Sequence, residues 1–297
     1  MLGEKNGKMY GKRLNFVLNA VKGNLNISMN NVKTILCKQV LVLPLFLLIY
    51  MICKNVNANN LEKKFHFDIQ YENFKTGQIF VSYERKNKKL ILTSKSVSEG
   101  FLSFFYSYQS QSISESIQYN NEWLPSSHVV RGLVNDEKRI SKVKWIDGKN
   151  ILKYEINPPL NLKKVFPIPE ESLSDVIDPI TAFLQIIQNI KANKDCSGKY
   201  RVFDGRRRYD VVSKKLGDVF LENDRPRSFK GKTVICGFKF LPIGGHRIKS
   251  KWKPENDKFT DVKIYFANLK ENLIFPVRMT LTRWFGKIIV RLLNNNV

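Results

Sequence analysis

Apolar and polar residues alternate with a period of two along most of the chain after residue 60. Over residues 65–71, aromatic or aliphatic side chains alternate with polar ones, and the same alternation resumes over residues 79–83. This pattern predicts two strands, each with one face toward a core and one toward water. We expect the intervening residues 75–77, Lys-Thr-Gly, to turn the chain and join these strands in a hairpin.

A second hairpin is predicted around Asp147 and Gly148, because alternating segments at residues 142–146 and 151–156 flank them. An Asp-Gly pair in this position favours a tight turn with a positive φ angle. The spacing of strand-like segments predicts a mainly β fold with a large antiparallel sheet or barrel. The further segments expected to be strands are residues 112–117, 129–134, 233–240, 262–266, 273–282 and 287–293.

Helical spacing is confined to two stretches. Asp178 and Pro179 suit the N-cap and first position of a helix that continues to Ile190. Its apolar residues fall on one face, so this principal helix must lie against an apolar surface. The other stretch, residues 101–108, is aromatic nearly all round and is expected to be a buried plug rather than a ligand site. Residues 158–171 contain four prolines and are expected to form a loop over the surface of one domain.

The continuous apolar run at residues 40–53 has a different character from the rest of the chain. It is shorter than the ~20 residues of a membrane-spanning helix, follows basic residues and precedes Val56-x-Ala58, as in a secretory signal. We therefore expect cleavage near Ala58, translation starting at Met29 and a basic leader or upstream translation before it. A single exported β-rich domain, residues 59–297, would remain. The alternative is an inner-membrane anchor retained through residues 40–53.

Composition adds a strongly basic character. The chain of 297 residues contains 50 Lys and Arg against 26 Asp and Glu, a net charge of +24. Residues 1–58 hold eight basic residues and one acidic residue, so the remainder carries +17. The basic residues are scattered rather than interleaved with stacking aromatics, so we do not expect nucleic-acid binding. A basic exterior facing an anionic membrane surface is compatible with this distribution.

Four cysteines divide into two groups. Cys37 and Cys53 lie in the leader, which leaves Cys196 and Cys236 in the exported domain. An even pair in an exported domain is most simply a disulfide, and two free buried thiols are the alternative. Closing that loop would stabilise the fold by about 4 kcal/mol in the chain-entropy model. No Cys-x-x-Cys spacing is present, so neither a redox motif nor a structural zinc site is expected.

Several motifs together resemble one family, the domain-of-unknown-function 3108 family of exported proteins in diderm bacteria. The motif at residues 201–210 contains the most specific part, the Val-Phe-Asp-Gly-Arg-Arg-Arg-Tyr-Asp run at residues 202–210. The resemblance extends over residues 65–293. The resemblance implies a signal sequence and a location in the cell envelope, and no established activity. With the signal cleaved, we expect that location to be the periplasm. By analogy with other exported β families, we expect an antiparallel half-barrel or spiral sheet packed around the principal helix. The supporting motifs are residues 178–184, Cys196, Cys236, residues 242–246 and residues 275–278.

The arginine run allows two local structures. Asp204 and Gly205 could form a two-residue hairpin turn, which would place Arg201 opposite Arg208, an unfavourable pairing of like charges. Alternatively, one strand runs straight through, with alternate residues on each face. Two roles follow: a ladder of ion pairs that fixes strand register, or an anion site, since guanidinium groups bind phosphate and carboxylate in a bidentate manner. The residues concerned are Asp204, Arg206, Arg207, Arg208 and Asp210.

Enzyme chemistry has little support in this sequence. The three histidines, His66, His128 and His246, are far apart and lie in no zinc or nucleophile-elbow motif. His66 is expected to face solvent, His128 to lie in a proline-containing loop and His246 in a Gly-Gly-His turn. We expect no catalysis, cofactor or metal.

Two functional hypotheses remain. The first is a periplasmic binding or carrier module for a hydrophobic or amphipathic envelope component, with the helix as a lid. The second is a structural or interaction protein that supports envelope integrity through its basic surface and edge strands. An apolar cavity between helix and sheet would favour the first, and close packing there the second.

Overall fold

The computed structural model describes residues 61–100, 103, 107–134, 136–250, 257–283 and 286–293. The chain divides into two units, Met1–Ala58 and Asn59–Val297, and all described residues belong to the second. The expected start at Met29, the signal cleaved near Ala58 and the alternative anchor therefore lie outside the described residues, as does most of the aromatic stretch 101–108. Among the described residues, no helix combines the length and hydrophobicity needed to span a membrane.

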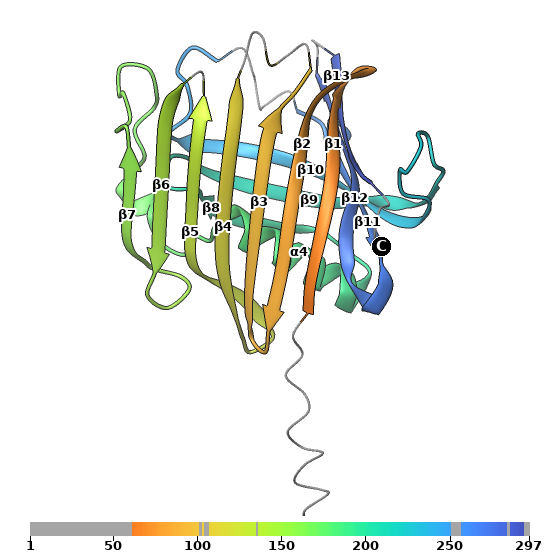
Figure 1. Ribbon diagram of the computed structural model, residues 1–297. Coiled ribbons are helices and arrows are strands. Elements are labelled where there is room, and N and C mark those ends of the chain that lie inside the picture. Colours follow the sequence, from red (N-terminus) through yellow and green to blue (C-terminus); the bar gives the residue numbers. More distant parts are fainter. Residues whose placement is uncertain are drawn as a thin grey trace, which may run out of the picture. The chain divides into compact units, whose positions relative to one another are not determined.

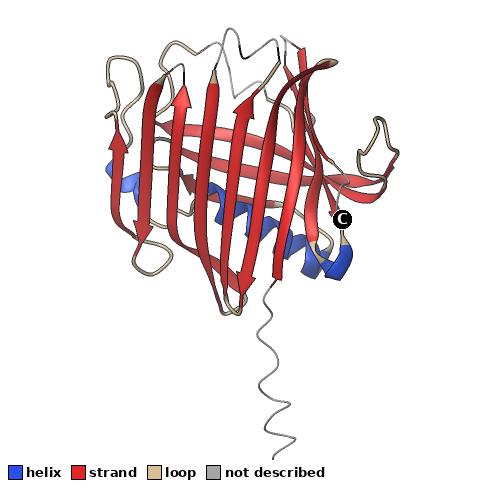
Figure 2. Ribbon diagram, viewed as in Figure 1, coloured by secondary structure: helices blue, strands red, loops and turns tan. Residues whose placement is uncertain are grey.

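The described residues form one antiparallel sheet of 13 strands, so the expected mainly β fold is confirmed (Figure 2). The strands follow the order β7-β6-β5-β4-β3-β2-β1-β13-β12-β11-β10-β9-β8, in which nearly all neighbours are consecutive in sequence. The bounds are β1 Leu61–Tyr71, β2 Phe74–Lys86, β3 Lys89–Ser98, β4 Tyr108–Tyr119, β5 Glu122–Val134, β6 Glu137–Trp145, β7 Ile151–Asn157, β8 Gly198–Phe203, β9 Arg208–Leu221, β10 Gly231–Gly244, β11 Val262–Asn268, β12 Ile274–Arg283 and β13 Gly286–Leu292.

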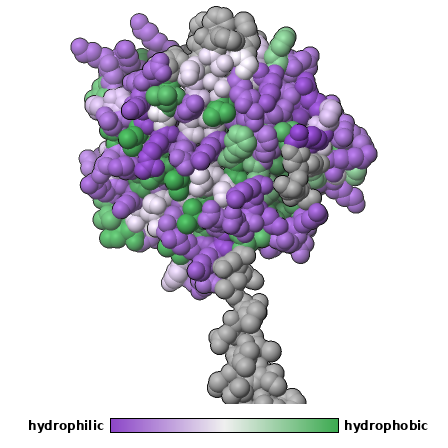
Figure 3. Space-filling model, viewed as in Figure 1, coloured by the Kyte–Doolittle hydropathy of each residue, from purple (hydrophilic) through white to green (hydrophobic). Residues whose placement is uncertain are grey.

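The sheet curls around one long helix of the described residues, α4 (Pro179–Asn193) (Figure 1). Strands β1–β7 form a front layer, and β8–β10 cross behind it. The helix contacts β4 and β5 of the front layer as well as β8 and β12. This is the expected spiral sheet packed around one principal helix. The outer face of the front layer mixes hydrophilic side chains with scattered hydrophobic ones, as alternation along strands requires (Figure 3).

The core consists mainly of two hydrophobic clusters that meet at α4. Leu184 belongs to the cluster built on β1, β3, β12 and β13, whereas Ile186 and Ile190 belong to the cluster built on β8 to β11. These three helix residues are 2–3% exposed. Since burying one large aliphatic side chain contributes about 1.5–3 kcal/mol, α4 stabilises both halves of the sheet at once.

Local interactions set both ends of α4. Asp178 is the N-cap residue, and its Oδ1 accepts hydrogen bonds from the backbone N–H groups of Ile180 at 2.8 Å and Thr181 at 3.2 Å. Pro179 suits the first helical position because an N–H group there would have no hydrogen-bond partner within the helix, and proline has none. Lys194 ends the helix in the left-handed region, with φ 57°.

Two turns differ from the sequence prediction. The β1–β2 turn lies at residues 72–73, and Gly77 lies inside β2 opposite Ile69. A Cβ atom at Gly77 would come within 2.6 Å of the Val97 carbonyl oxygen, so glycine serves close strand packing there instead of a turn. The β6–β7 loop does contain Gly148 with φ +77°, but it spans residues 146–150.

Candidate anion-binding cleft

The arginine run forms the tip of a hairpin between β8 and β9. Phe203 pairs with Arg208, and Arg201 pairs with Asp210. The straight-strand interpretation is therefore wrong, and the predicted two-residue turn is two residues too short. Because residues 204–207 all belong to the loop, a basic residue faces an acidic one where like charges were expected, and this pairing favours the observed register.

The hairpin tip rests against β6, which belongs to the opposite end of the sheet. Ser141 Oγ donates a hydrogen bond to the Asp204 carbonyl oxygen at 2.7 Å. Gly205 has φ +87°, and a Cβ atom there would lie 2.0 Å from Ser141 Oγ. Asp204 Oδ1 accepts hydrogen bonds from the backbone N–H groups of Arg206 at 2.9 Å and Arg207 at 2.7 Å. These contacts hold the backbone of residues 204–207 against β6, and so fix the positions from which the Arg206 and Arg207 side chains extend.

Arg208 is a structural member of the run. Its side chain is 2% exposed, and it donates to Asp210 Oδ1 at 2.6 Å and to the Ser172 carbonyl oxygen at 2.9 Å. Burial alone would raise the pKa of Asp210, but hydrogen bonds from Arg208 and Lys199 outweigh it and hold that pKa below its ordinary value. Of the two predicted roles, the ion-pair ladder therefore applies to Arg208 and Asp210. The Arg208 side chain also ties the 3-10 turn Glu170–Leu173 to β9.

Arg206 and Arg207 line a cleft of about 730 Å³ between β4–β6 and the β8–β10 side of the sheet. Among its lining residues are five arginines and one carboxylate, Asp204, so the lining is strongly basic. We call this space the arginine cleft. Its arginines are Arg139, Arg206, Arg207, Arg208 and Arg247.

The positive charges in the arginine cleft are crowded. Burial lowers the pKa of the Arg206 guanidinium, and the nearby Arg139 lowers it further, while Asp204 and Glu137 oppose this shift. Arg206 Nη1 donates to the Pro158 carbonyl oxygen at 3.0 Å. The Arg207 side chain is 64% exposed, and its Nε lies 3.3 Å from Asp204 Oδ2. A bound anion would relieve this repulsion and use guanidinium N–H groups.

The remainder of the arginine cleft is largely apolar. One side chain, His246, adds a buried Nδ1 atom with no hydrogen-bond partner, and burial lowers the pKa of this imidazole despite a hydrogen bond with the Gly244 backbone. The half-buried rings of Tyr209 and Phe240 lie 6.2 Å apart. The apolar lining is made by Tyr108, Val130, Val134, Ile140, Leu160, Val165, Tyr209, Phe240 and Pro242.

Sequence reasoning found Arg206 and Arg207 but missed Arg139 and Arg247. Arg139 lies on β6, and Arg247 pairs with Val165 in an isolated bridge beyond β10. Backbone bonds on either side, from Phe166 N to the His246 carbonyl oxygen at 3.0 Å and from Gly245 N to the Phe166 carbonyl oxygen at 2.8 Å, hold this region in place. The predicted surface loop thus forms a wall of the cleft.

A second cleft, of about 530 Å³, lies along β1–β3 and involves Lys64, Lys95 and Glu84. Its charges are fewer and partly balanced. Neither cleft includes a residue of α4. The arginine cleft is therefore the stronger candidate site.

A buried Ser-His-Asp group near the helix N-terminus differs from a catalytic triad. His128 lies on β5 and is 3% exposed, so the prediction of a loop position is wrong. Its Nδ1 lies 2.6 Å from Ser114 Oγ and 3.6 Å from Asp178 Oδ1, whereas a triad base uses its two ring nitrogens separately. Thr181 Oγ1 bonds Asp178 and lies 2.8 Å from Ser116 Oγ. These contacts fasten α4 to β4 and β5.

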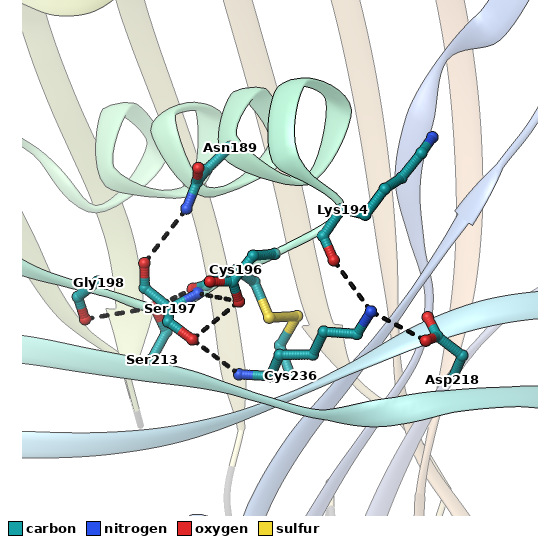
Figure 4. Close-up of a disulfide and its surroundings, with 10 residues drawn as sticks. Asn189, Lys194, Cys196, Ser197, Gly198, Ser213, Asp218 and Cys236 are labelled. Carbon is teal, nitrogen blue, oxygen red and sulfur yellow. Dashed lines mark hydrogen bonds and ion pairs between the residues drawn. A yellow bond between two sulfur atoms is a disulfide. The ribbon is translucent and has the colours of Figure 1, made fainter.

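Cys196 and Cys236 form a disulfide with Cα atoms 6.2 Å apart (Figure 4). Both residues are fully buried, and the bond joins the segment after α4 to β10. Ser213 Oγ on β9 donates to the Cys196 carbonyl oxygen at 2.5 Å. The disulfide thus holds the helix end against the sheet, away from the residues that line the arginine cleft. Among the described residues, no group of acidic, histidine or cysteine side chains is arranged to hold a metal ion.

Comparison with known proteins gives a family and a weak structural likeness. The model of a family described as "Protein of unknown function (DUF3108)" matches residues 66–292. The crystal structure of a β-barrel-like protein of domain of unknown function DUF1849 from Brucella abortus aligns with a TM-score of 0.46 and 9% identity, covering 78% of this chain and 96% of that one. No curated protein matches the chain.

Proposed function

Because the chain belongs to the DUF3108 family, whose description assigns no activity, we propose a function from its own cleft. It is a periplasmic binding or carrier module that holds an amphipathic anion of the cell envelope. The anionic group lies against Arg206, Arg207 and their arginine neighbours, and the hydrocarbon part lies along the apolar lining.

The composition of the arginine cleft carries this proposal. Five arginines and a single aspartate share a space of about 730 Å³ with an apolar lining. That volume is typical of small-molecule sites, which combine apolar walls with a few convergent polar groups. Guanidinium groups suit phosphate and carboxylate oxygens in particular. Arg139, Arg207 and Arg208 already pair with carboxylates of the chain, at Glu137, Asp204 and Asp210. The Arg206 guanidinium donates to the Pro158 carbonyl oxygen and has no ion-pair partner among the described residues, so a ligand that covers it should carry negative charge.

The arginine cleft lies elsewhere than the site expected from the sequence, which was a cavity with the helix as its lid. The side of α4 facing the sheet is filled by side chains such as Leu184 and Ile186, which are 2–3% exposed. Nothing about this packing favours a lid that opens over an apolar cavity. The proposed ligand therefore lies between the two ends of the curled sheet instead of beneath the helix.

The periplasmic location rests on the sequence. The apolar run at residues 40–53 and the small residues up to Ala58 are typical of a cleaved secretory signal. The disulfide between Cys196 and Cys236 suits an oxidising compartment. Retention of residues 40–53 as an inner-membrane anchor is the alternative, and it would leave the cleft on the same side of the membrane.

Binding of dodecyl phosphate, measured by calorimetry below its micelle concentration on the whole chain produced in a diderm host, tests this function. We expect saturable binding that weakens with salt, and no binding of the uncharged dodecyl maltoside. The variant R206Q/R207Q should bind at least about tenfold more weakly, a loss of roughly 1.4 kcal/mol.

The matched control is K86Q/K88Q, which removes the same charge from exposed side chains next to the β2–β3 turn, outside the cleft lining. It should bind as the unmodified protein does. Equal losses in both double variants would mean that overall charge attracts the phosphate, and the proposal would fail.

The second candidate function, an interaction protein of the envelope, is favoured by two observations. The close packing between α4 and the sheet is the arrangement expected of it. The strand β7 ends the sheet with exposed side chains, and among the described segments none covers its outer edge.

A further inference from the structure

The two edges of the sheet are treated differently. At β8, Ile177 forms a parallel bridge with Val202, donating to the Arg201 carbonyl oxygen at 2.9 Å and accepting from Phe203 N at 2.9 Å. At the other end, β7 pairs only with β6 among the described segments, and it lies at the left margin of the front layer (Figure 1). One edge is thus capped by the chain itself, and the other is left open by the segments that the structure describes.

Strand β7 lacks most of the features that protect edge strands from pairing. It contains neither proline nor glycine over Ile151–Asn157, and its only register irregularity lies at its first residues. Leu152 is 60% exposed and Tyr154 46% exposed. The remaining deterrent is Lys153, but Glu155 follows two residues later on the same face, and their side chains lie 2.9 Å apart.

The residues of β7 are complementary to themselves about Tyr154. In an antiparallel pair of two copies centred there, Lys153 faces Glu155 of the second copy on both sides of the centre. Leu152 likewise faces Ile156, and the two tyrosines face each other. Opposite charges and apolar or aromatic pairs are the cross-strand combinations that stabilise a sheet. A two-fold axis between directly opposed residues also gives an isologous interface, the commonest kind in homo-oligomers.

We propose that β7 is a homodimer interface, at which two copies of this chain join their sheets by antiparallel pairing centred on Tyr154. The inference is independent of the proposed function, since β7 supplies no side chain to the arginine cleft. One strand pair buries less surface than a standard stable interface, so the dimer dissociates on dilution. A strand of a different protein is the competing occupant, and the register at Tyr154 distinguishes the two.

Cysteine substitution tests this register. In whole chains carrying Cys37→Ser and Cys53→Ser, Tyr154→Cys places two thiols in directly opposed positions, where Cα atoms about 4.5–5.5 Å apart allow a disulfide. Leu152→Cys is the matched control, because the two copies of residue 152 would be displaced by about 13 Å along the strands. We expect a disulfide-linked dimer from Tyr154→Cys and a reduced monomer from Leu152→Cys under the same mild oxidation. Equal cross-linking of both variants, or of neither, would overturn the proposal.

Charge exchange provides a second test by sedimentation equilibrium. Lys153→Glu alone sets glutamate against Glu155 of the second copy twice, so the dissociation constant should rise at least tenfold. The exchange variant K153E/E155K restores opposite pairs and should recover most of the affinity. Melting curves must show both variants folded, since Glu155 also contacts Lys142 of its own chain at 3.2 Å. Monomers at every concentration, or no difference between the single and exchanged variants, would contradict β7 self-pairing. R206Q/R207Q should leave the dimer unchanged, which separates this inference from the proposed function.

Discussion

The space beneath α4 and the arginine cleft are bounded by the same curled sheet, yet one is filled and the other is open. Beneath the helix, Leu184, Ile186 and Ile190 pack into hydrophobic clusters, and the polar side chains there bond one another. In the cleft, Arg139 and Arg206 repel each other. Apolar side chains lower the free energy by packing against one another, whereas two guanidinium groups that repel each other oppose close packing of the cleft walls. The helix therefore holds the two halves of the sheet together, whereas the cleft remains open and is the place where we propose that a ligand binds.

The largest expected effect belongs to the filled region. Replacing both cysteines, C196A/C236A, should lower the free energy of unfolding by about 4 kcal/mol, because the denatured chain regains the entropy of a 40-residue loop. Urea unfolding measures this loss. Dodecyl phosphate should still bind to the folded variant. A variant that is folded by circular dichroism but no longer binds would show that the disulfide shapes the cleft, and the two regions would not be separate.

A single cavity in the same region should have the next largest effect. Ile186→Ala removes a side chain that is 2% exposed, and we expect it to lower the free energy of unfolding by about 3 kcal/mol. Val130→Ala in the cleft lining is the matched control, with an expected loss of about 1 kcal/mol, because that side chain is only half-buried. Equal losses from the two variants in urea unfolding would mean that the cleft is packed as tightly as the core.

The polar fastening of the helix should contribute less. Asp178→Ala removes the N-cap acceptor and leaves Ile180 N, Thr181 N and the Thr181 hydroxyl with one partner fewer. We expect a loss of about 2 kcal/mol in thermal or urea unfolding. Asp178→Asn keeps the side-chain acceptor and should lose less. An unchanged free energy of unfolding in Asp178→Ala would show that the N-cap adds no stability beyond the packing of α4.

The smallest effect concerns acid stability at the border of the cleft. Burial raises the pKa of Asp210, but the hydrogen bonds and charges of Arg208 and Lys199 together outweigh it and hold that pKa below its ordinary value. A carboxyl whose pKa is lower in the folded state contributes stability above its unfolded pKa and loses it as pH falls through the folded value. The free energy of unfolding should therefore fall as the pH drops below about 5, and less steeply in Asp210→Asn. Parallel pH profiles for the two proteins would show that the ladder does not contribute.

Local patterns made much of the filled region predictable. The helix was predictable because Asp178 and Pro179 mark its start and its apolar face is continuous. Its end was expected at Ile190, whereas the helix continues to Asn193. Most strands were found from alternation. Strand β3 was missed because only Leu90 and Leu92 mark its buried face, and the pattern turns polar after them.

The arginine cleft was only partly predictable. The run at residues 206–208 is visible in the sequence, but its hairpin register depends on Gly205 fitting against Ser141 of a distant strand. Arg139 and Arg247 reach the same space only because the sheet curls until the β8–β9 hairpin tip lies against β6. Such convergence is a property of the whole sheet, and no local spacing encodes it.

Hydrogen exchange with and without saturating dodecyl phosphate tests the central claim most directly, because it reports both regions in one experiment. We expect new protection of backbone amides in the hairpin at residues 204–209 and in residues 245–248, with exchange in α4 unchanged. Protection concentrated in α4, with none at the hairpin, would place the ligand beneath the helix and contradict the account.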